Sequence, residues 1–223
     1  MKFELHAHTF YSSDAIVSPE DFVKTAKIKG MNGIAVTDHN TTKGWKRVLA
    51  AGKRERIHVI KGEEVRVFHD GRKIGEILAL FINEDIKPGE FLEVKDKVKD
   101  QGGLLIVAHP FDFLRNHFRM TEEYKDHFDG VETMNARVLF DYFNRKAEEF
   151  ARKNHLGMIG GSDSHCRYEM CNGYTEADIA RAEELQKAIK NRKTKAYGKK
   201  TNPLIHTLSA LTKIGLFTPK ELR

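Results

Sequence analysis

The sequence predicts an α/β fold, arranged as a small, irregular barrel of mostly parallel strands with helices outside. Three observations favour it. Short apolar runs alternate with longer amphipathic runs along the 223 residues. The short runs are rich in Val, Ile and Leu and are bounded by Gly or by charge, which is typical of strands. An Asp70-Gly71 turn interrupts the alternation and indicates a hairpin.

Seven apolar runs are expected to form the main strands. A further run, residues 65–68, precedes the Asp-Gly turn and is expected to pair with the run that follows it. The seven runs are residues 3–5, 33–37, 58–61, 74–82, 104–108, 130–134 and 157–160.

Helical patterns lie between these strands. The first has a clear start, because Ser18 can cap the helix, Pro19 suits its first position, and Glu20 and Asp21 place acids in its first turn. The start at Pro88-Gly89-Glu90 is a weaker version. Helices are expected over residues 19–29, 45–53, 90–100, 139–154 and 178–191, with an amphipathic helix over 205–214 packed on the outside.

Composition limits the classes of protein. The chain is 40% hydrophobic and long enough for one sizeable core, so residues 1–223 are expected to form a single domain. No apolar run of 18 residues predicts a membrane span, and the first residues lack the apolar region of a secretion signal. Cys166 and Cys171 are too few for a disulfide framework. We therefore expect a cytoplasmic protein with no obligate protein partner.

The net charge of +6 suits an anionic substrate and leaves nucleic acid open as a partner. Much of the excess lies in residues 187–200, which hold lysines and an arginine but no acid. This run is either a solvated helix end followed by a basic loop or a rim that attracts phosphate. A helical and basic tail is expected over about 192–223.

Histidines and carboxylates follow the expected strands at the ends where they stop. His6 and His8 follow the first strand, and Thr37-Asp38-His39 follows the second. Gly62-Glu63-Glu64, His109-Pro110 and Gly161-Ser162-Asp163-Ser164-His165 follow three others. Because the carboxyl ends of parallel strands meet at one face of a barrel, we expect these side chains to gather there. Imidazole and carboxylate are common ligands of divalent metals.

Each of these motifs has an ordinary explanation when taken alone. A single His-x-His is often a surface accident, Asp38 can cap Thr41 or Thr42 in a turn, and His109 can hold a loop. Ser162 or Asp163 can cap a following helix. Their joint placement at strand ends favours metal binding, because burying so many ionisable groups together without a metal costs several kcal/mol.

The set of motifs resembles the polymerase and histidinol phosphatase (PHP) superfamily. The likeness rests on His6-Ala7-His8-Thr9, Asp14, Thr37-Asp38-His39, Gly62-Glu63-Glu64, His109-Pro110 and Gly161-Ser162-Asp163-Ser164-His165, which occur in the family's order within residues 1–168. The resemblance implies a distorted (β/α)7 barrel with two or three divalent ions of manganese, zinc or iron. It also implies hydrolysis of phosphomonoesters or phosphodiesters, in a small phosphorylated metabolite, a nucleotide or a short oligonucleotide.

Carried over to this chain, the resemblance assigns ligands to three ions. His6, His8, Glu63 and Asp163 would hold the first, and Glu63 would bridge to a second that His109 also binds. Asp14, His39 and His165 would hold the third. Glu64 stays the alternative to Glu63, since both follow Gly62. Glu76 stands where many relatives have a histidine, and its oxygen would favour harder ions such as Mn²⁺.

The implied chemistry is attack on phosphorus by a hydroxide that bridges two ions about 3.5–4 Å apart. Glu63, His39 and His165 are the expected catalytic residues, the two histidines lying near the leaving group. Arg115 and Arg137 are candidates for binding substrate phosphate, because guanidinium matches phosphate with paired hydrogen bonds.

Two other functions remain open. A His-x-His on the first strand also begins the amidohydrolase barrel, although no lysine ends a strand here at the bridging position. A metal-free, RNA-binding subunit resembling a ribonuclease P protein is the non-enzymatic alternative, and the basic tail is its support.

Overall fold

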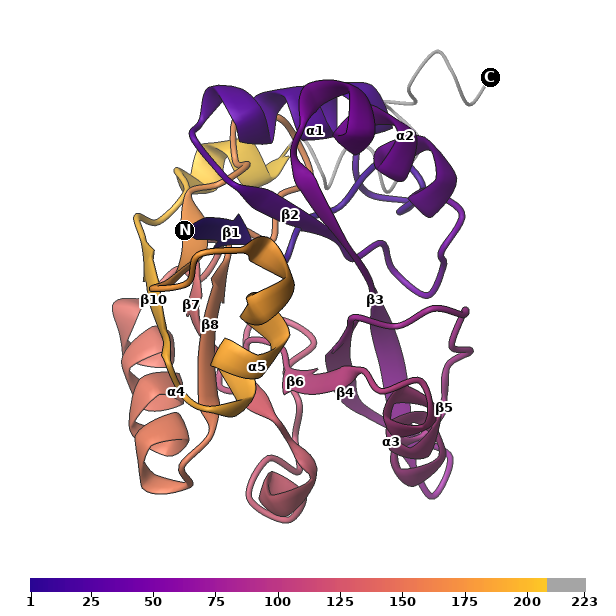
Figure 1. The fold of residues 1–223 in the computed structure, drawn as a ribbon. Helices are drawn as coiled ribbons and strands as arrows, with labels where there is room; N and C mark the ends of the chain where they lie inside the picture. The colour runs from indigo at the N-terminus through magenta and orange to yellow at the C-terminus, as the bar shows by residue number, and fades with distance from the viewer. Residues whose placement is uncertain (208–223) are drawn as a thin grey trace.

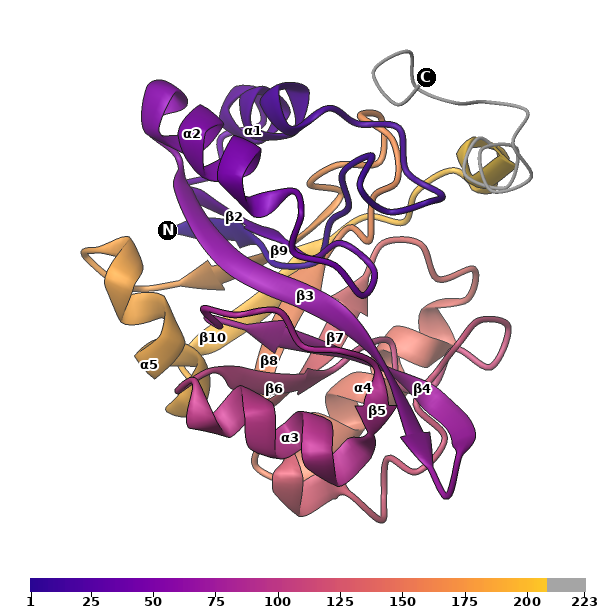
Figure 2. The same cartoon turned by 90° about the vertical axis from the view of Figure 1, so that its right-hand side faces the viewer.

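The computed structural model describes residues 1–207, and its sheet forms a nearly closed barrel (Figures 1 and 2). The predicted α/β barrel is confirmed. The sheet has the order β10-β9-β1-β2-β3-β4-β6-β7-β8, with β5 beside β3. The strands are β1 Lys2–Glu4, β2 Gly33–Val36, β3 His58–His69, β4 Arg72–Leu80, β5 Gly89–Glu90, β6 Leu104–Val107, β7 Gly130–Asn135, β8 Gly157–Gly161, β9 Gly173–Ala177 and β10 Thr194–Gly198.

Two strands make the barrel irregular. β1, β2 and β3 are parallel, and so are β6, β7 and β8, but β4 runs antiparallel to both of its neighbours. The hairpin between β3 and β4 is the predicted one. Its turn residues Asp70 and Gly71 have φ angles of 50° and 71°, the left-handed conformation that a two-residue hairpin turn requires. Strand β9, which is antiparallel to β1 and β10, is the second exception.

Helices α1 (Pro19–Ile28), α2 (Trp45–Glu55), α3 (Phe91–Asp100) and α4 (Asp141–Lys153) lie outside the sheet (Figures 1 and 2). Helix α1 begins as predicted, because the Ser18 hydroxyl accepts a hydrogen bond from the Asp21 N–H at 3.1 Å. Its buried face, Phe22, Val23 and Ala26, packs in the core cluster between helices and sheet.

The two faces of the sheet carry separate apolar clusters, as alternation along a strand requires. Ile34 and Val36 of β2 face the helix side, whereas Ala35 belongs to the inner cluster. Leu185 and Ile189 of the short helix α5 (Leu185–Lys190) also belong to the inner cluster. The core therefore fixes which face of each strand looks into the barrel.

Several expectations for the later part of the chain are wrong. The helix expected over residues 178–191 is reduced to α5, preceded by a 3-10 turn at Ala182–Glu184. Residues 194–198, expected in a basic tail, form the edge strand β10. The helix expected over 205–214 lies mostly outside the described residues.

Within residues 1–207, none of the helices combines the length and apolar character that crossing a bilayer requires.

Candidate metal centre

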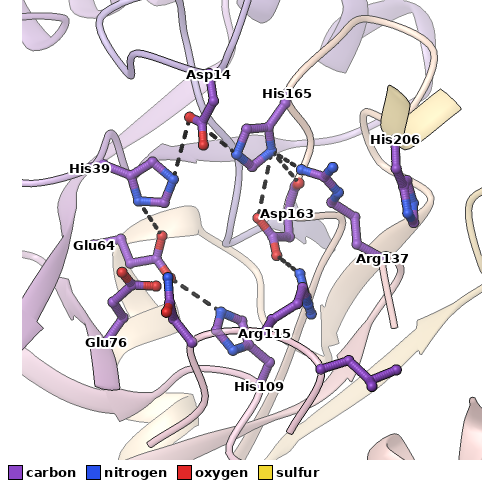
Figure 3. A pocket seen from close by; sticks show the side chains of 12 residues that line it. Asp14, His39, Glu64, Glu76, His109, Arg115, Arg137, Asp163, His165 and His206 are labelled. Atoms are coloured by element: carbon purple, nitrogen blue, oxygen red, sulfur yellow. Dashed lines mark hydrogen bonds and ion pairs between the residues drawn. The ribbon is translucent and has the colours of Figure 1, made fainter. Parts of the chain in front are cut away.

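Segments that follow β1, β2, β6 and β8 meet at one end of the barrel around a cavity of about 520 Å³. Glu64 also lines this cavity. It lies within β3, which continues to His69 and does not end at the glutamates. His6 and His8 lie beneath the cavity and are fully buried. The residues lining it include Asp14, His39, Glu64, Glu76, His109, Arg115, Arg137, Asp163, His165 and His206 (Figure 3).

The segments that follow β1 and β8 are joined by hydrogen bonds beside this cavity. The Asp163 N–H donates to the His6 carbonyl at 2.7 Å, and the His8 N–H donates to the Ser164 carbonyl at 3.0 Å. These bonds pair the segment after β8 with the segment after β1. The first and last predicted ligand motifs, about 155 residues apart in the chain, are thus neighbours.

Three groups of side chains in the described chain bring nitrogen and oxygen atoms within 4.8 Å of one another. His6 and His8 each belong to two groups, so the three groups form one continuous cluster. The groups are His6, Glu64 and His109; His6, His8 and Asp163; and His8, His39 and His165.

Asp14 lies beside the third group, His8, His39 and His165. Its Oδ1 atom lies 3.6 Å from Nε2 of His39 and 3.5 Å from Nε2 of His165. The structure therefore brings together eight of the predicted or alternative ligands around one cavity: His6, His8, Asp14, His39, Glu64, His109, Asp163 and His165.

The donor atoms of this cluster fit divalent metal ions. Several are buried without a hydrogen-bond partner, and each such atom costs about 1–3 kcal/mol of desolvation. Coordination of a cation would satisfy them, and mixed imidazole and carboxylate ligands suit manganese, zinc and iron. The unpartnered atoms of the cluster are Nε2 of His6, Nε2 of His8, Oδ1 of Asp14 and Nδ1 of His109.

The charged groups of the cluster shift one another's pKa values. Burial opposes ionisation of Glu64, but His6 and His39 hold its pKa well below the usual range. Burial would lower the pKa of His39, but Glu64 and Asp14 raise it to about 9. Burial and the neighbouring His39 and His165 lower the pKa of His8 to about 3. His8 is therefore neutral at pH 7 and has a lone pair for a cation.

The predicted choice of Glu63 over Glu64 is corrected by the geometry of β3. Successive side chains on a strand point to opposite faces, so only one of the two glutamates can face the cavity. Glu64 does so: its Oε2 lies 2.8 Å from Nδ1 of His39. Glu63 points the other way, where its Oε2 accepts a hydrogen bond from the Ile86 N–H at 3.0 Å. Burial there raises the pKa of Glu63 to about 8.

Glu76 lines the cavity but does not join any of the three ligand groups. It lies on β4 opposite Arg66 of β3, and its Oε1 lies 3.1 Å from the Lys73 ammonium. The structure thus places this carboxylate at the rim, paired with a lysine.

Arg115 and Arg137, the candidates for binding substrate phosphate, both lie in the cavity wall (Figure 3). Arg115 donates to Asp163 and to Asn135, and its Nε donates to Asp112 at 2.7 Å. Arg137 contacts His165, and its Nε lies 3.3 Å from Oε1 of Glu169. Carboxylates therefore hold both guanidinium groups beside the ligand cluster.

Three buried residues that support this cluster, Glu132, Asn135 and Glu169, were not among the predicted residues. Glu132 accepts from the His109 N–H at 2.9 Å and contacts Nδ1 of His6, and Asn135 donates to Asp163. Glu169 accepts from the His165 N–H at 2.7 Å. Asp38 accepts from Thr9 and Ser12 and not from Thr41 or Thr42. An acid inside an apolar strand, such as Glu132, was the available signal.

Two of the candidate ligands have unusual backbone conformations. His109 has a φ of 29° and Asp163 a φ of 53°, a region that residues other than glycine seldom adopt. Such conformations are retained at functional sites when the surroundings hold them in place. Here the hydrogen bonds from His109 N to Glu132 and from Asp163 N to the His6 carbonyl do so.

Comparison with known proteins gives the family. A model of the PHP domain matches residues 4–194. An uncharacterized protein of Methanocaldococcus jannaschii is 36% identical over 148 residues, which make up 61% of this chain and 82% of that protein. A protein of Caldicellulosiruptor saccharolyticus named probable phosphatase is 24% identical over 220 residues, covering 85% of this chain and 87% of its own.

The fold is also shared with a solved structure. A two-domain protein of Bacteroides vulgatus, described as containing a PHP-like metal-dependent phosphoesterase, superposes with a TM-score of 0.73 at 22% identity. The match covers 89% of this chain and 65% of that protein, slightly less than two thirds of its length. The family model, which spans most of the chain, is the decisive finding: this chain belongs to the PHP domain family.

Proposed function

We propose that this protein is a hydrolase that cleaves phosphoester bonds with the help of two or three divalent ions of manganese, zinc or iron. One observation carries the proposal. The buried imidazole nitrogens Nε2 of His6, Nε2 of His8 and Nδ1 of His109, which have no hydrogen-bond partner, belong to a cluster that borders the cavity whose wall holds Arg115 and Arg137. Groups that suit cations and groups that suit phosphate thus lie close together, which supports the proposal.

Each set of residues has a role in this proposal. His6, His8, His109, Glu64 and Asp163 would hold one or two ions, and Asp14, His39 and His165 would hold a further one. Bound divalent ions supply Lewis acidity and lower the pKa of water. Arg115 and Arg137 would orient the substrate phosphate, and His39 and His165 would lie near the leaving group. Glu64 takes the catalytic role first expected of Glu63.

The proposed substrate is a phosphorylated small molecule, a nucleotide or a short nucleic acid. A second cavity of about 420 Å³ shares Asp14, His39, Glu76 and Asn116 with the first. Tyr11, Lys43 and Arg66 also line it. It offers room and positive charge for the part of a substrate beyond the scissile phosphate.

The test is a substrate and metal screen. Protein stripped with EDTA would be supplied separately with Mn²⁺, Zn²⁺ or Fe²⁺ and assayed with p-nitrophenyl phosphate, bis-p-nitrophenyl phosphate, short oligonucleotides and a panel of amides. We expect metal-dependent release of nitrophenol from at least one phosphoester, and no such activity in the His8→Ala variant. Hydrolysis of amides alone would favour the amidohydrolase alternative. No metal uptake, together with RNA binding, would favour the non-enzymatic alternative.

A further inference from the structure

The residues after β10 return to the candidate metal centre and complete one wall of its cavity. The Lys199 N–H donates to the Asn172 carbonyl at 2.8 Å, and the Asn172 side chain donates to the Thr201 hydroxyl at 3.0 Å. The Thr201 N–H then donates to the Ala136 carbonyl at 2.7 Å. Thr201 is buried, so the chain at this point is fastened to the barrel beside Arg137.

A short turn then sets the position of His206. Asn202 caps the 3-10 turn Pro203–Ile205, because its side-chain oxygen accepts from the Leu204 N–H at 3.0 Å. His206 directly follows this turn and lines the cavity with Arg115 and Arg137 (Figure 3). The side chain of Leu204, in the same turn, is 76% exposed. The turn thus directs one residue to the cavity and one to solvent.

One carboxylate lies near both His206 and Arg137. Oε1 of Glu169 lies 3.3 Å from Nε of Arg137 and 3.8 Å from Nε2 of His206. The other oxygen of Glu169 accepts from the backbone N–H groups of His165 and Cys166, so the carboxylate is fixed. Arg137 and His206 therefore share one neighbouring carboxylate and line the same cavity at the edge of the ligand cluster.

We propose that His206 contacts the substrate phosphate as a third donor beside Arg115 and Arg137. This inference rests on the proposed phosphoester site and adds to it a residue outside the span, 4–194, that the family model matches. Burial and the adjacent Arg137 and Arg115 lower the pKa of His206 to about 4. Its imidazole is then neutral at pH 7 and donates one N–H without adding to the charge of the two arginines.

The experiment compares His206→Ala, His206→Asn and Leu204→Ala in the full chain loaded with Mn²⁺. Leu204→Ala is the matched control, since it shortens an exposed side chain of the same turn. Calorimetry with inorganic phosphate measures binding without turnover, and p-nitrophenyl phosphate separates KM from kcat. Thermal denaturation and the metal content of each variant check that the fold and the cluster remain intact.

Loss of one hydrogen bond predicts about five-fold weaker phosphate binding and a matching rise in KM for His206→Ala. His206→Asn, which keeps a neutral donor, should recover much of the phosphate affinity. Leu204→Ala should have the phosphate affinity and KM of the wild type. Equal phosphate affinity in His206→Ala and Leu204→Ala would overturn the inference, as would a wild type that binds no phosphate. A wild type that binds phosphate through His206 but hydrolyses no ester would instead refute the proposed function.

Discussion

The Nδ1 atom of His6 lies 2.8 Å from Oε1 of Glu132, and both side chains are fully buried. A hydrogen bond from Nδ1 to this carboxylate fixes the ring and leaves Nε2 with its lone pair towards the cluster. Partners of this kind orient metal-binding histidines and raise their basicity. Glu132 therefore acts on the candidate metal centre without facing the cavity.

We expect Glu132→Gln to weaken metal binding by about 10–100-fold, the range found for residues that support a ligand. The amide can still accept from the His109 N–H, so the loss should come chiefly from His6. Titration with Mn²⁺ or Zn²⁺ after EDTA treatment measures it. Glu176→Gln, on the exposed side of β9, is the control and should bind metal like the wild type.

The two neighbouring glutamates of β3 should respond in opposite ways. Glu64→Gln removes a charged oxygen from the cluster and should lower kcat/KM by at least about 100-fold, as expected when a charge at the reacting centre is lost. Glu63→Gln should leave kcat/KM within about two-fold of the wild type, because Gln can accept the Ile86 hydrogen bond. Steady-state kinetics with both variants decides it. Inactivation by Glu63→Gln with unchanged thermal stability would restore the first assignment.

Metal removal should destabilise the fold. An ion that binds only the folded state, at a free concentration 100 times its Kd, adds about 2.7 kcal/mol to the free energy of unfolding. We expect EDTA to lower the Tm and Mn²⁺ or Zn²⁺ to restore it. His8→Ala should abolish most of this response, since His8 belongs to two of the three ligand groups. The same Tm with and without metal in the wild type would contradict a filled site.

Gly173 should be intolerant of any side chain. A Cβ there would lie 2.1 Å from the Gly161 carbonyl oxygen, where β9 passes β8. We expect Gly173→Ala to destabilise the protein by about 3 kcal/mol or more, because the atoms that the Cβ would meet, the carbonyl oxygen and carbon of Gly161, belong to the backbone. Gly89→Ala is the matched control, since its Cβ would meet nothing closer than 3.7 Å. Denaturant unfolding of both variants gives the two free energies.

The sequence was sufficient to predict most residues of the cluster because histidine beside a carboxylate is unusual at the ends of apolar strands. His6, His39 and His165 follow such strands, and the structure brings them together. Glu63 was preferred to Glu64 as the ligand because a difference of one residue decides which face of the strand a side chain takes. The apolar residues near the two glutamates do not distinguish them.

The end of the barrel was harder to predict. β9 and β10, with the sequences Gly-Tyr-Thr-Glu-Ala and Thr-Lys-Ala-Tyr-Gly, lack a run of large apolar residues. They are strands because β9 pairs with β1, far away in the sequence, and β10 pairs with β9. His206 could not be predicted from a motif either. Its position depends on the contacts of Thr201 with Asn172 and Ala136, which are far away in the sequence.

The pairing of residues 6–8 with residues 163–164 has a consequence for how the molecule opens. His8 belongs to one side of this junction and Asp163 to the other, and their side chains face the same group of donor atoms. A cation bound there would link the two ends of the sheet through His8 and Asp163. Amide protons of this junction should consequently exchange with solvent faster after chelation, while those buried under α1 keep their protection.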